Sequence, residues 1–414
     1  MNFKFIRSLA KPFLFWSIFI GIGIEIILHY KFNLLPLKIL NHTTGPIQRL
    51  GQYSKKNVIP SGYIALIGDS NVYGFGPWLY DNSWSMKQPS FATHHLLHKS
   101  LNKDVVAYGY PGFGTFGYSL SAVAEYEMIS ESLLWKKHEA PKHILIVFYE
   151  GNDLFNNLHE VQQRGVKISN KTHDDLVNQV SNLFDKELGK LQNEFSILDQ
   201  LVVWNITSGI IKNYFNKFSS KSEVITEQNE AIFSNSLKEI KRKNNDPENT
   251  AIINGEKVHL GYLEGPALHL TESEISISLE ITKQSFEYIK EKFPQSQIDV
   301  VYLSTALSLY DFNNSNLRPA PLKININSKS SRDRIFSSKD IKLKNQYLRK
   351  AIELISKDIK IGFIDTTNEM KKLAKNYRLH GPRDPIHLNR KGYETFAEII
   401  RAYLIRFNQP FNLN

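Results

Sequence analysis

Ser70 and His387 are the two side chains of this sequence whose surroundings best suit acyl-transfer chemistry. Ser70 lies in the segment GDSNVYG (68–74), directly after a short apolar run, so that a tight turn would present its hydroxyl at the edge of a sheet. His387 could take the proton of that hydroxyl as a general base, and Asp384, three residues earlier, could orient the imidazole. Each pattern taken alone is also compatible with a helix cap or a surface position.

Two further segments contain groups that could stabilise an oxyanion. Gly112 lies in YPGFG (110–114), where glycines allow backbone N–H groups to approach a ligand closely. Asn152 lies in EGND (150–153), and its side-chain amide could donate to a developing negative charge. The simpler alternatives are a plain turn for the first segment and a turn or an Asx cap for the second.

Five short apolar runs predict the strands that must position these segments. Each run is rich in Ile, Val and Tyr and apolar on both faces, as strands of a covered parallel sheet are. The runs are 63–67, 105–108, 144–149, 298–303 and 361–364. Helical patterns lie between and after them, at 90–101, 117–135, 272–292, 340–357 and 391–406. This alternation predicts an α/β fold, a three-layer α/β/α sandwich around a parallel, flavodoxin-like sheet.

The four polar segments are more informative together than singly, because of the order in which they occur. Three of them follow the first three predicted strands, and ligands of open α/β sheets bind beyond the carboxyl ends of the strands. The fourth, DPIH, precedes the last predicted helix. In this order the segments GDSNVYG, YPGFG, GND and DPIH resemble the four blocks of the SGNH/GDSL hydrolase superfamily. The resemblance covers roughly residues 60–155 and 295–408.

The resemblance implies a role for each matched residue. Ser70 would be the nucleophile, His387 the base, and Asp384 the acid that orients it. The backbone N–H groups of Ser70 and Gly112 and the side-chain amide of Asn152 would form the oxyanion hole. No cofactor and no metal ion are implied.

Two positions depart from the superfamily's pattern. The family usually has glycine two residues before the asparagine of the third block, but Glu150 stands there, and Gly151 directly precedes Asn152. A carboxylate at this position could alter substrate choice or could point away from the site. The second block also lacks the asparagine that often precedes its glycines, and Tyr108 lies near that place. Neither departure removes a predicted catalytic atom.

The amino-terminal segment predicts a membrane anchor. The run FLFWSIFIGIGIEIIL (13–28) is almost unbroken in its apolar character and follows three basic residues. A cleaved signal peptide and a buried globular helix are the alternatives. No small-x-small cleavage site follows the run, and the aromatic residues Trp16 and Tyr30 suit membrane interfaces, so an uncleaved transmembrane signal anchor fits best. The basic residues favour a cytoplasmic amino terminus only slightly.

The positive charge of the chain is concentrated near this anchor. Residues 1–60 hold eight lysines and arginines and one acidic residue, Glu25, which accounts for seven of the ten net positive charges. The rest of the chain is nearly neutral, which argues against nucleic-acid binding. Glu25 lies inside the apolar run and must be protonated, paired or close to the headgroups.

The sequence divides into four predicted parts. Residues 1–30 form the cytoplasmic tip and anchor, and 31–60 a linker rich in proline and glycine. Residues 61–155 and 295–408 form the hydrolase-like domain, interrupted by a mainly helical insertion at 156–294. The polar tract 313–339 is expected to be a loop or flap.

Two other clusters have simpler explanations. His94, His95 and His98 offer an i, i+4 pair on one helix, but no third ligand lies at motif spacing, so an amphipathic helix is favoured over a metal site. The aromatic residues Trp78, Tyr80 and Trp84 are expected in the core or, alternatively, along a substrate cleft where they could stack on a sugar. The chain contains no cysteine, which excludes disulfides and thiol nucleophiles.

These observations and the resemblance lead to one expected function with several alternatives. We expect a membrane-anchored serine esterase that acts outside the cytoplasm on acyl esters, such as acetyl esters, of cell-envelope glycans. The alternatives are an O-acyltransferase to a glycan, a lipid esterase at the membrane surface, and a catalytically silent binding or assembly module. The expected partners are an acylated glycan or lipid substrate and the membrane.

Overall fold

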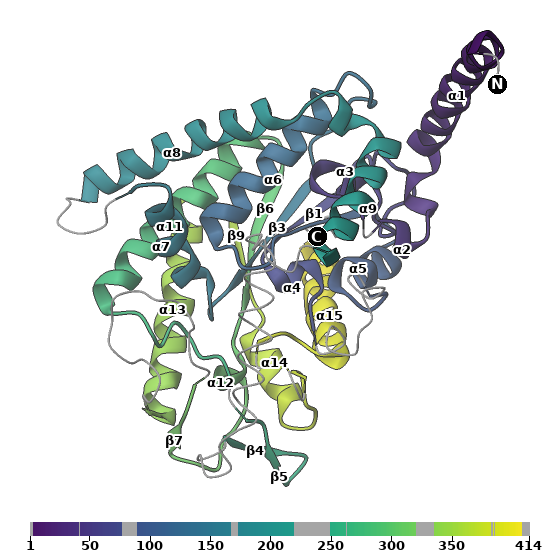
Figure 1. The fold of residues 1–414 in the computed structure, drawn as a ribbon. Coiled ribbons are helices and arrows are strands. Elements are labelled where there is room, and N and C mark those ends of the chain that lie inside the picture. The colour runs from purple at the N-terminus through teal and green to yellow at the C-terminus, as the bar shows by residue number, and fades with distance from the viewer. Residues whose placement is uncertain are drawn as a thin grey trace, which may run out of the picture.

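The computed structural model describes most of the chain, and Figure 1 shows its arrangement. The described residues are 3–40, 42–76, 89–166, 173–218, 249–261, 263–319, 335–381, 384 and 386–407. Within them, one sheet lies between two helical layers, and one long helix projects from the body (Figure 1).

The central sheet consists of five parallel strands in the order β2-β1-β3-β6-β9. Counted among themselves, these strands follow the 2-1-3-4-5 order of flavodoxin-like sheets. All five correspond to the predicted apolar runs, with ends that differ by one residue at most. Their bounds are β1 Ile64–Gly68, β2 Val105–Gly109, β3 His143–Tyr149, β6 Gln297–Leu303 and β9 Gly362–Asp365. The predicted parallel α/β sheet is therefore confirmed.

Helices cover both faces of this sheet, which explains why its strands are apolar throughout. The first face carries α6 Thr115–Ser130, α7 Asp153–Gln163, α11 Glu272–Lys292 and α13 Ser338–Asp358, with α8 His173–Glu194 packed on α6 and α11. The second face carries α5 Thr93–Leu101, α12 Ala306–Leu309, α14 Thr367–Ala374 and α15 Arg390–Phe407. In β3, Ile144 and Phe148 point to the first layer and Leu145 and Val147 to the second, and all are fully buried.

Residues 32–60, which the sequence presents as a linker, pack against the domain. They form η1 Phe32–Leu34, α2 Leu37–Leu40 and α3 Gly45–Leu50, and bury several apolar side chains. Gln52 accepts a hydrogen bond from Ala107 N (2.8 Å) and donates one to Ala107 O (2.7 Å), and so pairs with the outer edge of β2. Buried Arg49 donates to Glu125 and to the Ala107 carbonyl, at 2.5 and 3.2 Å. Proline and glycine shorten the helices here, but the segment protects an otherwise open sheet edge.

The region expected as a mainly helical insertion contributes several kinds of structure. It includes η4 Leu198–Gln200 and α9 Val202–Phe218, and α11 packs directly on α6 and α7 within the first helical layer. It also contains an antiparallel hairpin, β4 Thr250–Ile253 with β5 Glu256–His259, which the sequence did not predict. In the polar tract, β7 Asn316–Leu317 pairs with β8 Phe336–Ser337.

Helix α1, Phe3–Lys31, projects from the body in Figure 1. Within the described part of the chain, it is the helix that is long and apolar enough to cross a membrane, over the window Phe15–Leu34. Large apolar side chains along it are exposed: Phe13, Phe15, Trp16, Phe19, Ile20, Ile22, Ile24, Ile26 and Ile27. Length, composition and exposure therefore all suit a membrane span.

The base of α1 is fastened to the domain through polar contacts. The Glu25 carboxylate accepts hydrogen bonds from Val202 N (2.6 Å) and Val203 N (3.0 Å), at the amino terminus of α9. The His29 ring stacks on Trp135 with ring centroids 3.9 Å apart. Glu25, which is costly in an apolar run, is thus paired with helix-terminal N–H groups that would otherwise lack partners.

Candidate active site

Ser70 begins a short helix at the carboxyl end of β1. Helix α4 spans Ser70–Tyr73, and the side chain of its N-cap, Asp69, accepts a hydrogen bond from Asn71 N at 2.8 Å. The GDS segment therefore folds as a strand, a capped turn and a helix start. This local geometry holds Ser70 at the sheet edge, where it is 5% exposed.

Ser70, His387 and Asp384 form a continuous hydrogen-bonded relay. His387 Nε2 lies 2.8 Å from Ser70 Oγ, and His387 Nδ1 lies 2.8 Å from Asp384 Oδ2. The other Asp384 oxygen accepts from the backbone N–H groups of Ile386 (3.0 Å) and His387 (2.9 Å). The carboxylate thus fixes both the backbone and the ring of the histidine. This is the arrangement required for a hydroxyl nucleophile with a general base.

The segment before α15 holds His387 in place. Asn389 accepts a hydrogen bond from Gly392 N and donates to the Arg378 carbonyl, both within 2.9 Å. On α15, the Tyr393 hydroxyl donates to the carbonyl of Phe75 at 2.6 Å, and the Phe75 ring meets the His387 ring edge-on at 5.7 Å. The loop that follows Ser70 is therefore tied to the helix that follows His387.

Electrostatics favour the protonated form of His387. Burial lowers the pKa of this imidazole, but the carboxylates of Asp384, Asp69 and Glu264 together outweigh that effect, and the resulting pKa lies above the ordinary histidine value. Burial also raises the pKa of Asp69, against the hydrogen bond from Asn71 N. Asp384 is thus placed to stabilise an imidazolium formed when Ser70 gives up its proton.

The second glycine-rich segment folds as a rigid turn at the end of β2. Gly112 has φ of +79°, Pro111 precedes it, and Phe113 N donates to the Tyr110 carbonyl at 3.2 Å, as in a type II turn. Two side chains of α7 accept hydrogen bonds from the backbone that follows this turn. Glu160 accepts from Gly114 N at 2.6 Å, and Asn157 accepts from Phe116 N at 3.0 Å.

The third segment leaves one amide near the end of β3. Asn152 is the N-cap of α7, yet its side chain makes no capping hydrogen bond, and its amide oxygen is buried without a partner among the described residues. Asp153 turns back toward the strand and accepts from Tyr149 N at 2.9 Å. The Glu150 carboxylate is paired within the fold, because it accepts hydrogen bonds from Thr305 N and from the Asn345 side chain.

The five predicted site residues therefore fall into two groups. Direct contacts join Ser70, His387 and Asp384. Gly112 and Asn152 each follow, by three residues, a strand that pairs with β1, so they lie at the same edge of the sheet as Ser70. Their part in an oxyanion hole remains a prediction.

Comparison with known proteins yields one structural resemblance. No protein-family model matches the sequence, and no curated protein matches it. Among solved structures, an acetyl xylan esterase from the rumen bacterium Butyrivibrio proteoclasticus is similar with a TM-score of 0.34 and 11% sequence identity. The match covers 85% of this chain and 65% of that one, so the chain spans about two thirds of that structure's length.

Several residues around the site were not predicted, because nothing in the sequence marks them as part of it. Glu160 and Asn157 clamp the second segment from α7, and Glu264 lies buried near Tyr149 and His387. Burial raises the pKa of Glu264 to about 7. Only Asp69 had a recognisable signal, because an aspartate before a helix start is a typical N-cap.

The structure describes the histidine cluster but not the aromatic cluster. His94 is fully buried and His95 lies mostly inside, and burial lowers the pKa of both rings. The described residues contain no group of three side chains suited to hold a metal ion. Trp78, Tyr80 and Trp84 lie outside the described residues.

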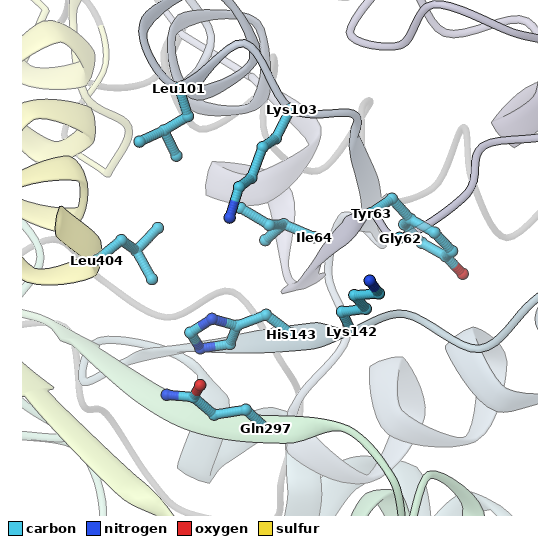
Figure 2. A pocket seen from close by; sticks show the side chains of 9 residues that line it. All are labelled: Gly62, Tyr63, Ile64, Leu101, Lys103, Lys142, His143, Gln297 and Leu404. Atoms are coloured by element: carbon cyan, nitrogen blue, oxygen red, sulfur yellow. The ribbon is translucent and has the colours of Figure 1, made fainter. Parts of the chain in front are cut away.

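A cavity of about 150 Å³ lies at the opposite edge of the sheet, at the amino ends of β1, β3 and β6 (Figure 2). Lys103, Lys142 and His143 are among its lining residues. His143 Nε2 is already paired with Asp299 Oδ2 at 2.5 Å. Because the cavity lies at the amino ends of the strands, it is separate from the Ser70 site at their carboxyl ends.

The raised pKa of His387 leads to a pH prediction. The base must be neutral, so kcat/KM should fall as pH drops through a pKa above about 6.5. Asp384→Asn removes the carboxylate that contributes most to this rise in pKa, so the acid limb should move to lower pH. Maximal turnover should fall too, by less than for His387→Ala. Profiles of kcat/KM against pH for wild type and Asp384→Asn test this prediction. An acid limb that stays at the same pH in a stably folded variant would contradict it.

Asn152→Ala tests the predicted oxyanion donor. If the amide stabilises charge in the transition state, kcat should fall about 10²–10³-fold with little change in KM. If Asn152 only caps α7, the loss should instead be about 1 kcal/mol of stability with near-normal turnover. The absence of a capping bond favours the first result. Melting temperature and kcat, measured on the same preparation, decide between the two.

Proposed function

We propose that the protein is a serine esterase of the SGNH/GDSL type that works through an acyl-enzyme. The observation that carries this proposal is the relay from Ser70 Oγ through His387 to Asp384, with both contacts at 2.8 Å. It combines a nucleophile, a base and an orienting acid at the carboxyl edge of a parallel sheet. A silent binding module would have no need of this arrangement.

In the proposed reaction, Ser70 Oγ attacks the ester carbonyl while His387 Nε2 takes its proton. The N–H groups of Ser70 and Gly112 and the Asn152 amide stabilise the resulting oxyanion. Collapse of this intermediate breaks the bond to the alcohol, which leaves with the proton from His387. Water then attacks the acyl-enzyme and gives a proton to His387. Collapse of this second intermediate releases the acid, and His387 returns the proton to Ser70 Oγ. If a sugar hydroxyl attacks in place of water, the same steps transfer the acyl group to a glycan.

The proposed substrates are acyl esters, for example acetyl esters, of cell-envelope glycans. This assignment follows the superfamily resemblance together with the helix α1, which suits a single membrane span. The amino terminus would be cytoplasmic and the domain extracytoplasmic, because basic residues precede the apolar run. A lipid ester in the adjoining membrane is the alternative substrate.

Removal of the nucleophile or the base tests the proposal. Ser70→Ala and His387→Ala should each lower turnover of an aryl acetate by several orders of magnitude, because the two groups act as a unit. Ser285→Ala is a matched control, since that buried serine donates to the Ile281 carbonyl within α11. A fluorophosphonate probe should label wild type and the control but not Ser70→Ala. Wild-type turnover in Ser70→Ala would contradict the mechanism.

Extraction of the full-length protein tests the anchor. The exposed apolar surface of α1 predicts that the protein resists high salt and carbonate and dissolves in detergent. Its amino-terminal sequence should begin at Met1 or Asn2, because no cleavage site follows the apolar run. A mature chain that begins after residue 28 would indicate a signal peptide in place of the anchor.

A further inference from the structure

Glu264 reaches the candidate site from the region between the β4–β5 hairpin and α11. This segment crosses the carboxyl edge of the sheet and is held there by two backbone hydrogen bonds. Ala267 N donates to the Glu150 carbonyl at 3.1 Å, just after β3, and Leu307 N donates to the Glu264 carbonyl at 3.2 Å, just after β6. Glu264 thus lies where ligands of such sheets bind.

The contacts of the Glu264 side chain place it beside the relay. Its carboxyl group lies beside Tyr149, whose hydroxyl donates a hydrogen bond to the carbonyl of Ile386, the residue before His387, at 3.3 Å. One carboxyl oxygen also lies against the third segment, because a Cβ atom on Gly151 would come within 2.6 Å of Glu264 Oε2. A glycine at 151 therefore leaves room for this carboxylate.

The oxygen Oε2 of Glu264 is buried and has no hydrogen-bond partner among the described residues. The whole residue is only 8% exposed. Glu150, two residues before Asn152, contrasts with it, since donors reach both of its oxygens. The amide oxygens of Asn71 and Asn152, which follow Ser70 and Gly151, are likewise buried and unpartnered within the described chain. A hydroxyl of a bound ligand would supply the donor that these acceptors lack among the described residues.

We propose that Glu264 forms a subsite for the alcohol portion of the substrate, in which Oε2 accepts a hydrogen bond from a hydroxyl next to the ester. The inference rests on the proposed esterase function and deepens it. A sugar carries hydroxyls beside its acyl group and an alkyl ester does not, so the subsite selects esters of polyhydroxylated alcohols over those of simple ones. A site built around a hydrogen bond discriminates strongly against a substrate that lacks the partner group.

Two acetyl esters that differ by one hydroxyl test the subsite. They are 2-acetoxycyclohexanol and cyclohexyl acetate, measured with the full-length protein in detergent. After correction for their uncatalysed hydrolysis rates, wild type should prefer the first by about tenfold or more in kcat/KM. Glu264→Leu should remove this preference while kcat/KM for cyclohexyl acetate stays within about twofold. Glu264→Gln, which keeps a carbonyl oxygen, should restore part of it. Glu256→Gln, on exposed β5, is the control that should change nothing.

The outcomes separate the subsite from the proposed function. Equal loss on both esters in Glu264→Leu, or loss on neither, contradicts the subsite and leaves the esterase intact. If Glu264→Leu does not fold, wild type decides alone, since equal kcat/KM for the two esters contradicts the subsite. A wild type that hydrolyses neither ester contradicts the proposed function, and the subsite fails with it.

Discussion

The hydrogen bond between Ser70 and His387 joins two segments that lie 317 residues apart in the chain, and the candidate site depends on it. It can form only because β1 ends at the same edge of the sheet that the segment before α15 reaches. The parallel order of β2, β1 and β3 brings the ends of three strands together there. Contacts near the site, such as the hydrogen bond from Gly392 N to Asn389 and the one from Tyr393 to the Phe75 carbonyl, restrain the two ends of this interaction.

Several carboxyl groups are buried around the site. Asp384 raises the pKa of His387, while burial raises the pKa of Asp69 and of Glu264. Glu160, with a pKa raised by burial to about 8, clamps the turn that carries Gly112. The paired oxygens of these acids position the backbone and the base. Oε2 of Glu264 and Oε2 of Glu160 are buried without a hydrogen-bond partner among the described residues.

The five strands could be predicted because they are apolar on both faces. This pattern is visible in the sequence without knowing which strands lie side by side. The order of the polar segments also pointed to Ser70, Asp384 and His387. The structure brings these three side chains into hydrogen-bond contact, while their catalytic roles stay predictions. The packing of residues 32–60 was not predictable, because Arg49 and Gln52 acquire their roles only from the edge of β2. Glu264 is similar. Its proximity to Tyr149 arises from a long connection, and no periodicity marks such a contact.

Trapping the acyl-enzyme tests the role of Ser70 as nucleophile most directly. Full-length protein is mixed with an activated acetyl ester, quenched in acid within the first turnovers, and analysed by mass spectrometry after proteolysis. The acyl-enzyme mechanism predicts one acetyl group on the peptide that contains Ser70, and its absence from that peptide in Ser70→Ala. Turnover with no covalent acetyl group at Ser70, or with the group on another residue of a folded and active protein, would contradict this mechanism.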